Sequence, residues 1–186
     1  RWADTSLTWV RPLHSVNVLV DGQPIAGWID LGGAKRIAFG MTAMGHPFYP
    51  SDPVSLSDFD SYVAAMKDVH VLVDHEDRKA RIADQLENVA ATKQLQPVAD
   101  DNLLDEVTGL VEWPNVIMGQ IETEFMSLPP EVLVTSMRVH QKFFALSQKG
   151  ATENLAPFFM TVTNRCSDLV NDKLIAAGNE LSLIHI

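Results

Sequence analysis

Residues 15–29, SVNVLVDGQPIAGWI, show how the chain begins to fold, because two mostly apolar runs flank the pair Asp21-Gly22. An Asp-Gly pair between apolar runs is a strong signal for a two-residue β-hairpin, since both turn positions require positive φ. Gly32-Gly33 interrupts the second run. Residues 36–39 then predict another short strand, and residues 42–50 predict a shaped loop. The beginning of the chain therefore predicts β structure.

The apolar spacing changes to that of a helix after residue 55. A helix of about three turns is predicted there, capped by Ser55 or Ser57, on the spacing of Leu56, Phe59, Val63 and Met66. Residues 69–73 are β-rich and predict a strand. Residues 75–95 predict a longer helix whose apolar stripe is Ile82, Leu86, Val89 and Ala90.

A third helix is predicted over residues 100–111. Asp100 and Asp101 lie where the positive end of the helix dipole favours acidic side chains, and Trp113-Pro114 would end the helix. Its expected packed face is Leu103, Leu104, Val107, Leu110 and Val111, and its expected solvent face is Asp101, Asp105 and Thr108. Residues 116–121 predict a strand.

A fourth helix is predicted from Pro129-Pro130-Glu131 to about His140, since proline fits the first helical turn. Strands are predicted at 142–146 and 158–163, and a last helix over 168–177 that Gly178 ends. Strands and helices alternate without a regular βαβ repeat. The expected fold class is therefore α+β, with mixed or antiparallel strands and several packed helices.

The charge balance limits the classes of partner. Twenty-four acidic against fourteen basic residues give a net charge of −10, which argues against a broad electropositive surface that binds nucleic acid non-specifically, and no DNA partner is expected. A single cysteine, Cys166, fits a reducing compartment, so a cytoplasmic location is expected. No apolar run approaches the ~20 residues that span a bilayer, so no membrane partner is expected.

General chemical motifs predict no catalytic residue, no metal site and no bound cofactor in this chain. His75-Glu76-Asp77 lacks the second histidine of a helical metal motif. The glycines have neither the Rossmann spacing nor the lysine of a P-loop. Cys166 follows Arg165 but no nucleophile motif surrounds it, so an inert thiol is expected.

One basic cluster follows an acidic stretch, since residues 94–137 contain eight carboxylates and no Lys or Arg. It contains Arg138, His140, Gln141 and Lys142, followed by two phenylalanines. Such side chains can pair with phosphates and stack on bases, so RNA binding is one interpretation. The alternative is a helix end whose cations lie near the negative pole of the helix dipole. Both interpretations remain open at this point.

Longer strings carry more specific information. They are WVRPLH at 9–14, LLDEVTGLVEWP at 103–114, LPPEVLVTSMRVHQKFF at 128–144, LAPF at 155–158, VTN at 162–164 and GNE at 178–180. In these strings and their order, the chain resembles the beta subunit of the bacterial tetrameric glycyl-tRNA synthetase. The resemblance covers residues 9–180, nearly the whole chain.

The resemblance implies an α2β2 aminoacyl-tRNA ligase whose alpha subunit activates glycine with ATP, while the beta subunit binds tRNA(Gly) and completes the assembly. Residues 1–180 would then be an amino-terminal part of the beta subunit, without a catalytic centre and with a fold similar to the editing-type modules of the phenylalanyl-tRNA synthetase beta subunit. A sub-boundary is considered near residues 50–56. Residues 181–186 are expected to be a non-native or truncated tail.

One loop departs from the family pattern. Where the family usually has Thr-x-Gly-His-Arg-Phe, residues 43–48 read AMGHPF, so the arginine of that motif is absent. The further tRNA-binding candidates are Arg11 and His14 from the matched string at 9–14 and His46 from this loop, in addition to the basic cluster. Two alternatives to tRNA binding are considered, an editing-type hydrolase using His14, Thr42 and His46, and a purely structural subunit contact.

Overall fold

The computed structural model describes residue 8, residues 13–49 and residues 51–165. Two compact units divide the chain, residues 1–73 and residues 74–186, and each is described by itself. The division lies between Val73 and Asp74, and the sub-boundary near 50–56 stays a prediction. Other predicted features lie outside the described residues, namely Arg11, Cys166, the helix over 168–177 and the tail 181–186.

The predicted hairpin of the first unit is confirmed. Strand β2 (Leu19–Val20) pairs antiparallel with β3 (Gln23–Pro24), so that Asp21 and Gly22 alone form the turn. Their φ angles are 48° and 73°, as a type I′ turn requires. The Asp-Gly pair therefore determines this turn.

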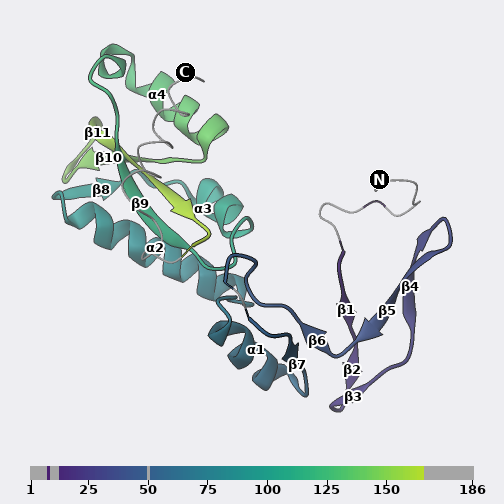
Figure 1. Cartoon of the computed structure of the whole chain (residues 1–186). Helices are drawn as coiled ribbons and strands as arrows, with labels where there is room; N and C mark the ends of the chain where they lie inside the picture. The colour runs from purple at the N-terminus through teal and green to yellow at the C-terminus, as the bar shows by residue number, and fades with distance from the viewer. Residues whose placement is uncertain (1–7, 9–12, 50, 166–186) are drawn as a thin grey trace. The chain divides into compact units, whose positions relative to one another are not determined.

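The remaining strands of the first unit form two small sheets (Figure 1). Strand β5 (Lys35–Gly40) lies between β1 (Val16–Asn17) and β4 (Trp28–Gly32), parallel to the first and antiparallel to the second. Strand β6 (Thr42–Ala43) pairs antiparallel with β7 (Val54–Ser55), so part of the predicted loop is a strand.

Helix α1 (Phe59–Asp68) begins later than expected, because Asp58 rather than Ser55 or Ser57 is its N-cap. The Asp58 carboxylate accepts a hydrogen bond from the backbone N–H of Ser61 at 2.8 Å. Leu56 and Met66 are buried as expected, but Phe59 is 72% exposed. Phe59 was therefore assigned wrongly to the packed stripe.

The predicted strand over residues 69–73 is wrong. His70 has a φ of 62° and ends α1, and the N–H of Val71 donates to the carbonyl of Met66 at 2.8 Å. These are the features of a Schellman-type helix end. The valines that suggested a strand, Val69, Val71 and Val73, instead pack against the core of the unit without strand pairing.

The second unit contains a four-stranded antiparallel sheet with the order β8-β10-β11-β9. Its strands are β8 (Leu95–Pro97), β9 (Asn115–Gln120), β10 (Phe144–Gln148) and β11 (Ala151–Thr163). Antiparallel strands interspersed with helices confirm the predicted α+β class.

Helices cover both faces of this sheet. Successive side chains along a strand point to opposite faces, and here they belong to two different hydrophobic cores. Phe144 and Met160 lie opposite each other and pack with helices α2 (His75–Ala91) and α3 (Asp101–Thr108). The next pair along, Ala145 and Phe159, packs instead with the helix that follows residue 129. Figure 1 shows α2 lying along the strands. The predicted stripe of α2 is buried against this sheet.

Helix α3 is shorter than predicted and presents a different face. It ends at Thr108, with Gly109 as C-cap, well before Trp113-Pro114. The Thr108 side chain is buried. Its hydroxyl donates a hydrogen bond to the carbonyl of Leu104 at 2.7 Å, which makes burial of this polar group possible. Leu110 is 48% exposed because it follows the helix end. Both side chains were assigned to the wrong face.

The fourth predicted helix is confirmed as two continuous segments. A 3-10 turn, η1 (Phe125–Ser127), precedes α4 (Pro130–Ser136), which has proline at its first position. The chain then continues as a π-helix, η2 (Met137–Gln141), to the predicted end near His140. In the described part of the chain, no helix has the length and apolar character needed to cross a membrane.

Candidate functional site

The basic cluster lies where the π-helix η2 ends. The final residue of η2, Gln141, is followed by Lys142. Lys142 has φ 58° and ψ 39°, a left-handed conformation that is uncommon for a residue with a side chain. The N–H of Phe143 then donates to the carbonyl of Met137 at 3.0 Å and turns the chain toward β10. Short π-helices occur frequently at functional sites, so this segment is the first candidate site.

Both cations of the cluster are paired with carboxylates of another helix. Arg138 Nε lies 2.8 Å from Asp100 Oδ2, and Lys142 Nζ lies 2.9 Å from Glu106 Oε1. Asp100 is the N-cap of α3 and Glu106 lies within that helix, and both belong to the acidic stretch that precedes the cluster in the sequence. The structure therefore adds cross-helix ion pairing to the two interpretations that the sequence left open.

A third ion pair joins α3 to α2, between Lys79 Nζ and Asp105 Oδ1 at 2.6 Å. The hydrogen bond from Lys79 holds the pKa of the Asp105 carboxyl below its ordinary value. The same hydrogen bond raises the pKa of the Lys79 ammonium group. Three acids of one short helical region thus bind three cations, and much of the local charge is neutralised.

The other two cluster residues differ in exposure. His140 is exposed on η2, whereas Gln141, the last residue of η2, is half-buried. The structure thus brings the four cluster candidates together on one short segment. His14 and His46 lie in the first unit, and Arg11 lies outside the described residues.

The three residues considered for hydrolysis differ strongly in exposure. His46 is only 1% exposed, and its Nδ1 accepts a hydrogen bond from the backbone N–H of Phe48 at 3.2 Å. His14 and Thr42 are exposed. A general base must come within hydrogen-bond reach of the attacking water and the ester. Since His46 is covered, its position does not favour hydrolysis of a tRNA ester.

Sequence reasoning missed a polar cluster that positions the segment between α3 and β9. Asn164 Oδ1 accepts the N–H groups of Glu112 and Trp113 at 2.9 and 2.8 Å. Gln85 donates to the carbonyl of Pro114 and accepts the N–H of Val116. The strings EWP and VTN were informative because their residues meet here. Their detected role is structural support of the backbone.

Sequence reasoning also missed a cavity of about 580 Å³ in the first unit. It lies beside the Asp21-Gly22 turn and the first turn of α1. Phe59 lines it, and the only signal in the sequence was an aromatic residue directly after a helix cap. Among the described residues, no group of three or more His, Cys, Asp and Glu is arranged to hold a metal ion.

The family model of the glycyl-tRNA synthetase beta subunit matches residues 1–184. The chain is 37% identical over 199 residues to the glycine–tRNA ligase beta subunit of Rhodospirillum centenum, covering 97% of this chain and 28% of that protein. It is 42% identical over 164 residues to that of Paracoccus denitrificans, covering 88% and 24%. It is 36% identical over 180 residues to that of Bacillus subtilis, covering 97% and 25%. The chain thus spans about a quarter of the length of these relatives.

Proposed function

The chain belongs to the glycyl-tRNA synthetase beta subunit family, and from this premise we propose that it serves in ATP-dependent glycylation of tRNA(Gly). Its proposed contributions are tRNA binding and α2β2 assembly. The observation that carries this proposal is the family match over residues 1–184, together with relatives named as glycine–tRNA ligase beta subunits.

The chemical step is proposed to occur on the alpha subunit. There ATP and glycine would form the activated intermediate, and this part of the beta subunit would bind neither. It would act without a catalytic residue of its own, in the cytoplasm, where charged tRNA is used. The two partners of this proposal are the alpha subunit and tRNA(Gly).

For tRNA binding we assign the phosphate contacts to Arg138 and Lys142. The Arg138 side chain is 46% exposed, and each cation is held by a single carboxylate. Exposed ion pairs of this kind contribute about 0–1 kcal/mol. An arginine–phosphate contact is charge-assisted and frequently bidentate, so a phosphate can replace the carboxylate. Asp100 and Glu106 would then hold the two cations in position until tRNA binds.

For assembly we assign a contact to the loop between β6 and β7. Met44 and Phe48 are exposed large apolar side chains in this loop, and Met41, which precedes β6, is also exposed but to a smaller extent. Exposed apolar patches mark protein interaction sites, and methionine adapts to varied partner surfaces. The buried His46 holds the loop between them, since it bonds the backbone of Phe48. These observations support a protein partner at this loop.

The experiment combines the alpha subunit with the full-length beta subunit and measures glycylation and sedimentation. The variant R138A/K142A is expected to raise KM for tRNA and to leave the assembly intact. The variant M44S/F48S is expected to weaken the assembly. Lys149, an exposed cation in the β10–β11 turn, supplies the matched control K149A, which should leave both measurements unchanged. Unchanged KM and unchanged assembly in the two test variants would overturn the proposal.

A further inference from the structure

The cavity of about 580 Å³ in the first unit has acidic and aromatic walls. Its volume lies within the ~300–1,000 Å³ typical of ligand pockets. One wall is the β-hairpin turn with Asp21, and the other is the start of α1 with Asp58, Phe59 and Tyr62. Leu19 and Leu56 add an apolar surface. We call this the acidic-aromatic cavity.

The two walls are held close together by the backbone. A Cβ atom placed on Gly22 would lie 3.1 Å from the carbonyl oxygen of Ser57, and Gly22 has a φ of 73°. Leu19 packs against the small core of the first unit that includes the buried Leu56. The turn and the helix start therefore form a built cavity whose shape depends on local contacts.

The charges of the cavity are of one sign. Asp21 and Asp58 line it, and the described lining residues include no Lys, Arg or His. The N–H of Ser61 and the hydroxyl of Ser57 donate to Asp58 and hold its pKa below the ordinary value. Asp58 is therefore negatively charged at physiological pH. A ligand that brings its own carboxylate or phosphate is repelled here.

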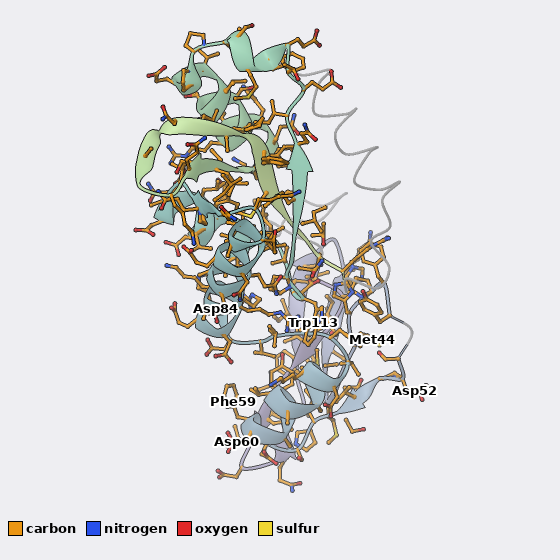
Figure 2. The ribbon with its side chains drawn as sticks, turned by 90° about the vertical axis from the view of Figure 1, so that its left-hand side faces the viewer. Met44, Asp52, Phe59, Asp60, Asp84 and Trp113 are labelled. Carbon is orange, nitrogen blue, oxygen red and sulfur yellow. The ribbon has the colours of Figure 1, made fainter. Side chains whose placement is uncertain are left out.

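The aromatic wall favours a cation that also has a flat surface. Phe59 is highly exposed at the first position of α1, where Figure 2 labels it beside Asp60. Its ring centroid lies 6.5 Å from that of Tyr62, with the rings tilted by 55°. A guanidinium group stacks on aromatic faces and forms bidentate bonds with carboxylates. An arginine side chain can therefore pair with a carboxylate of the cavity and stack on the exposed ring of Phe59.

We propose that the acidic-aromatic cavity binds an arginine side chain presented by a peptide segment of a partner protein. A peptide fits better than a free amino acid or a nucleotide, because its flanking groups are neutral amides and it brings no anion into an acidic site. A metal ion fits less well, since the described lining offers it only the carboxylates of Asp21 and Asp58 and no third acidic, histidine or cysteine ligand. The proposal concerns protein recognition and is independent of the phosphate contacts assigned to Arg138 and Lys142.

The test uses the full-length protein that contains this chain and isothermal titration with two short peptides. The first is Ac-Gly-Leu-Arg-Leu-Gly-NH2, and the second replaces arginine with the neutral isostere citrulline. We expect the arginine peptide to bind at millimolar concentration and the citrulline peptide to bind at least several-fold more weakly. Absence of binding by the arginine peptide, or equal binding of both peptides, overturns the proposal.

Variants locate the binding in the cavity. D21N preserves the hairpin, because Asn-Gly is also favoured in type I′ turns, and it should weaken binding about two- to fivefold. F59A removes an exposed ring and should weaken binding by a similar factor. The matched control is D60N, which makes the same charge change on a residue that does not line the cavity. A loss in D60N equal to that in D21N would contradict the assigned site, and thermal melts confirm folding of each variant.

Discussion

The carboxylate of Asp100 acts on two elements at once and thereby ties Arg138 to helix α3. Its Oδ1 accepts the N–H of Leu103 at 3.0 Å as the helix cap, and its Oδ2 lies 2.8 Å from Arg138 Nε. Capping and pairing are separable, because an asparagine side chain can cap a helix without attracting a cation.

The first prediction separates these two roles. Asp100→Ala should lower the free energy of unfolding by about 0.5–2 kcal/mol, since the N–H of Leu103 loses its partner. Asp100→Asn should lower it by less, because the amide oxygen still accepts that hydrogen bond. Urea denaturation of both variants measures the difference. Equal losses in the two variants would show that the ion pair, and not the cap, dominates.

The second prediction concerns the corrected face of α3. Leu103 is buried in the core beside the sheet, so Leu103→Ala should cost about 2–5 kcal/mol. Leu110→Ala removes the same atoms from an exposed position and should change stability by about 0.5 kcal/mol or less. Thermal and urea unfolding of the pair compare them directly. A larger effect at Leu110 than at Leu103 would mean that the assignment of the face is wrong.

The third prediction uses two glycines with different surroundings. A Cβ on Gly45 would lie 2.6 Å from Val69 Cβ and 2.5 Å from Ser51 Oγ, so Gly45→Ala should destabilise by about 1–3 kcal/mol. Gly109 has helical φ and ψ, and its nearest contact would be 3.4 Å. Gly109→Ala should therefore leave stability unchanged or raise it by about 0.4–1 kcal/mol. Melting temperatures that fall equally in both variants would contradict this.

The fourth prediction is a pH dependence of the Lys79–Asp105 pair. Because Lys79 lowers the pKa of Asp105, the contribution of Asp105 is complete above its unfolded pKa of about 4 and is lost as the pH falls through the lower folded value. Because the pKa of Lys79 is raised, the contribution of Lys79 to stability is complete below its unfolded pKa of about 10.4 and is lost only as the pH rises through the higher folded value.

Asp105→Asn should therefore be less stable than the natural sequence at pH 7 and equally stable in strong acid. Urea unfolding at the two pH values measures this, and high salt should reduce the difference. Asp84→Asn, an exposed acid on α2 that Figure 2 labels, serves as the control. A difference of the same size at both pH values would show that the charge of Asp105 is not its cause.

Local patterns in the sequence predicted those features that depend on few residues. The Asp21-Gly22 turn was predictable because its two positive φ angles restrict the residue choice. Helix α2 was predictable because its apolar stripe repeats over several turns. The α+β class followed from the order of such segments.

Features that depend on distant partners were not predictable. The valines of residues 69–73 suggested a strand, but the left-handed His70 ends α1 and places them against the core. Arg138 was read beside its neighbours in sequence, whereas its partner Asp100 belongs to another helix. The exposure of Phe59 has a local cause instead, because Phe59 is the first residue of the helix that Asp58 caps.

The most direct test of the tRNA-binding assignment is the salt dependence of tRNA(Gly) binding by the full-length beta subunit assembled with the alpha subunit. If Arg138 and Lys142 contact phosphates, Arg138→Ala and Lys142→Ala should each weaken binding and reduce the slope of log affinity against log salt by about one. Asp100→Asn, which releases Arg138 from its carboxylate, should bind tRNA at least as tightly as the natural sequence. The control Lys149→Ala should bind tRNA as tightly as the natural sequence does. Unchanged affinity at low salt for both Arg138→Ala and Lys142→Ala would contradict the account and leave the two residues as structural ion-pair partners of α3.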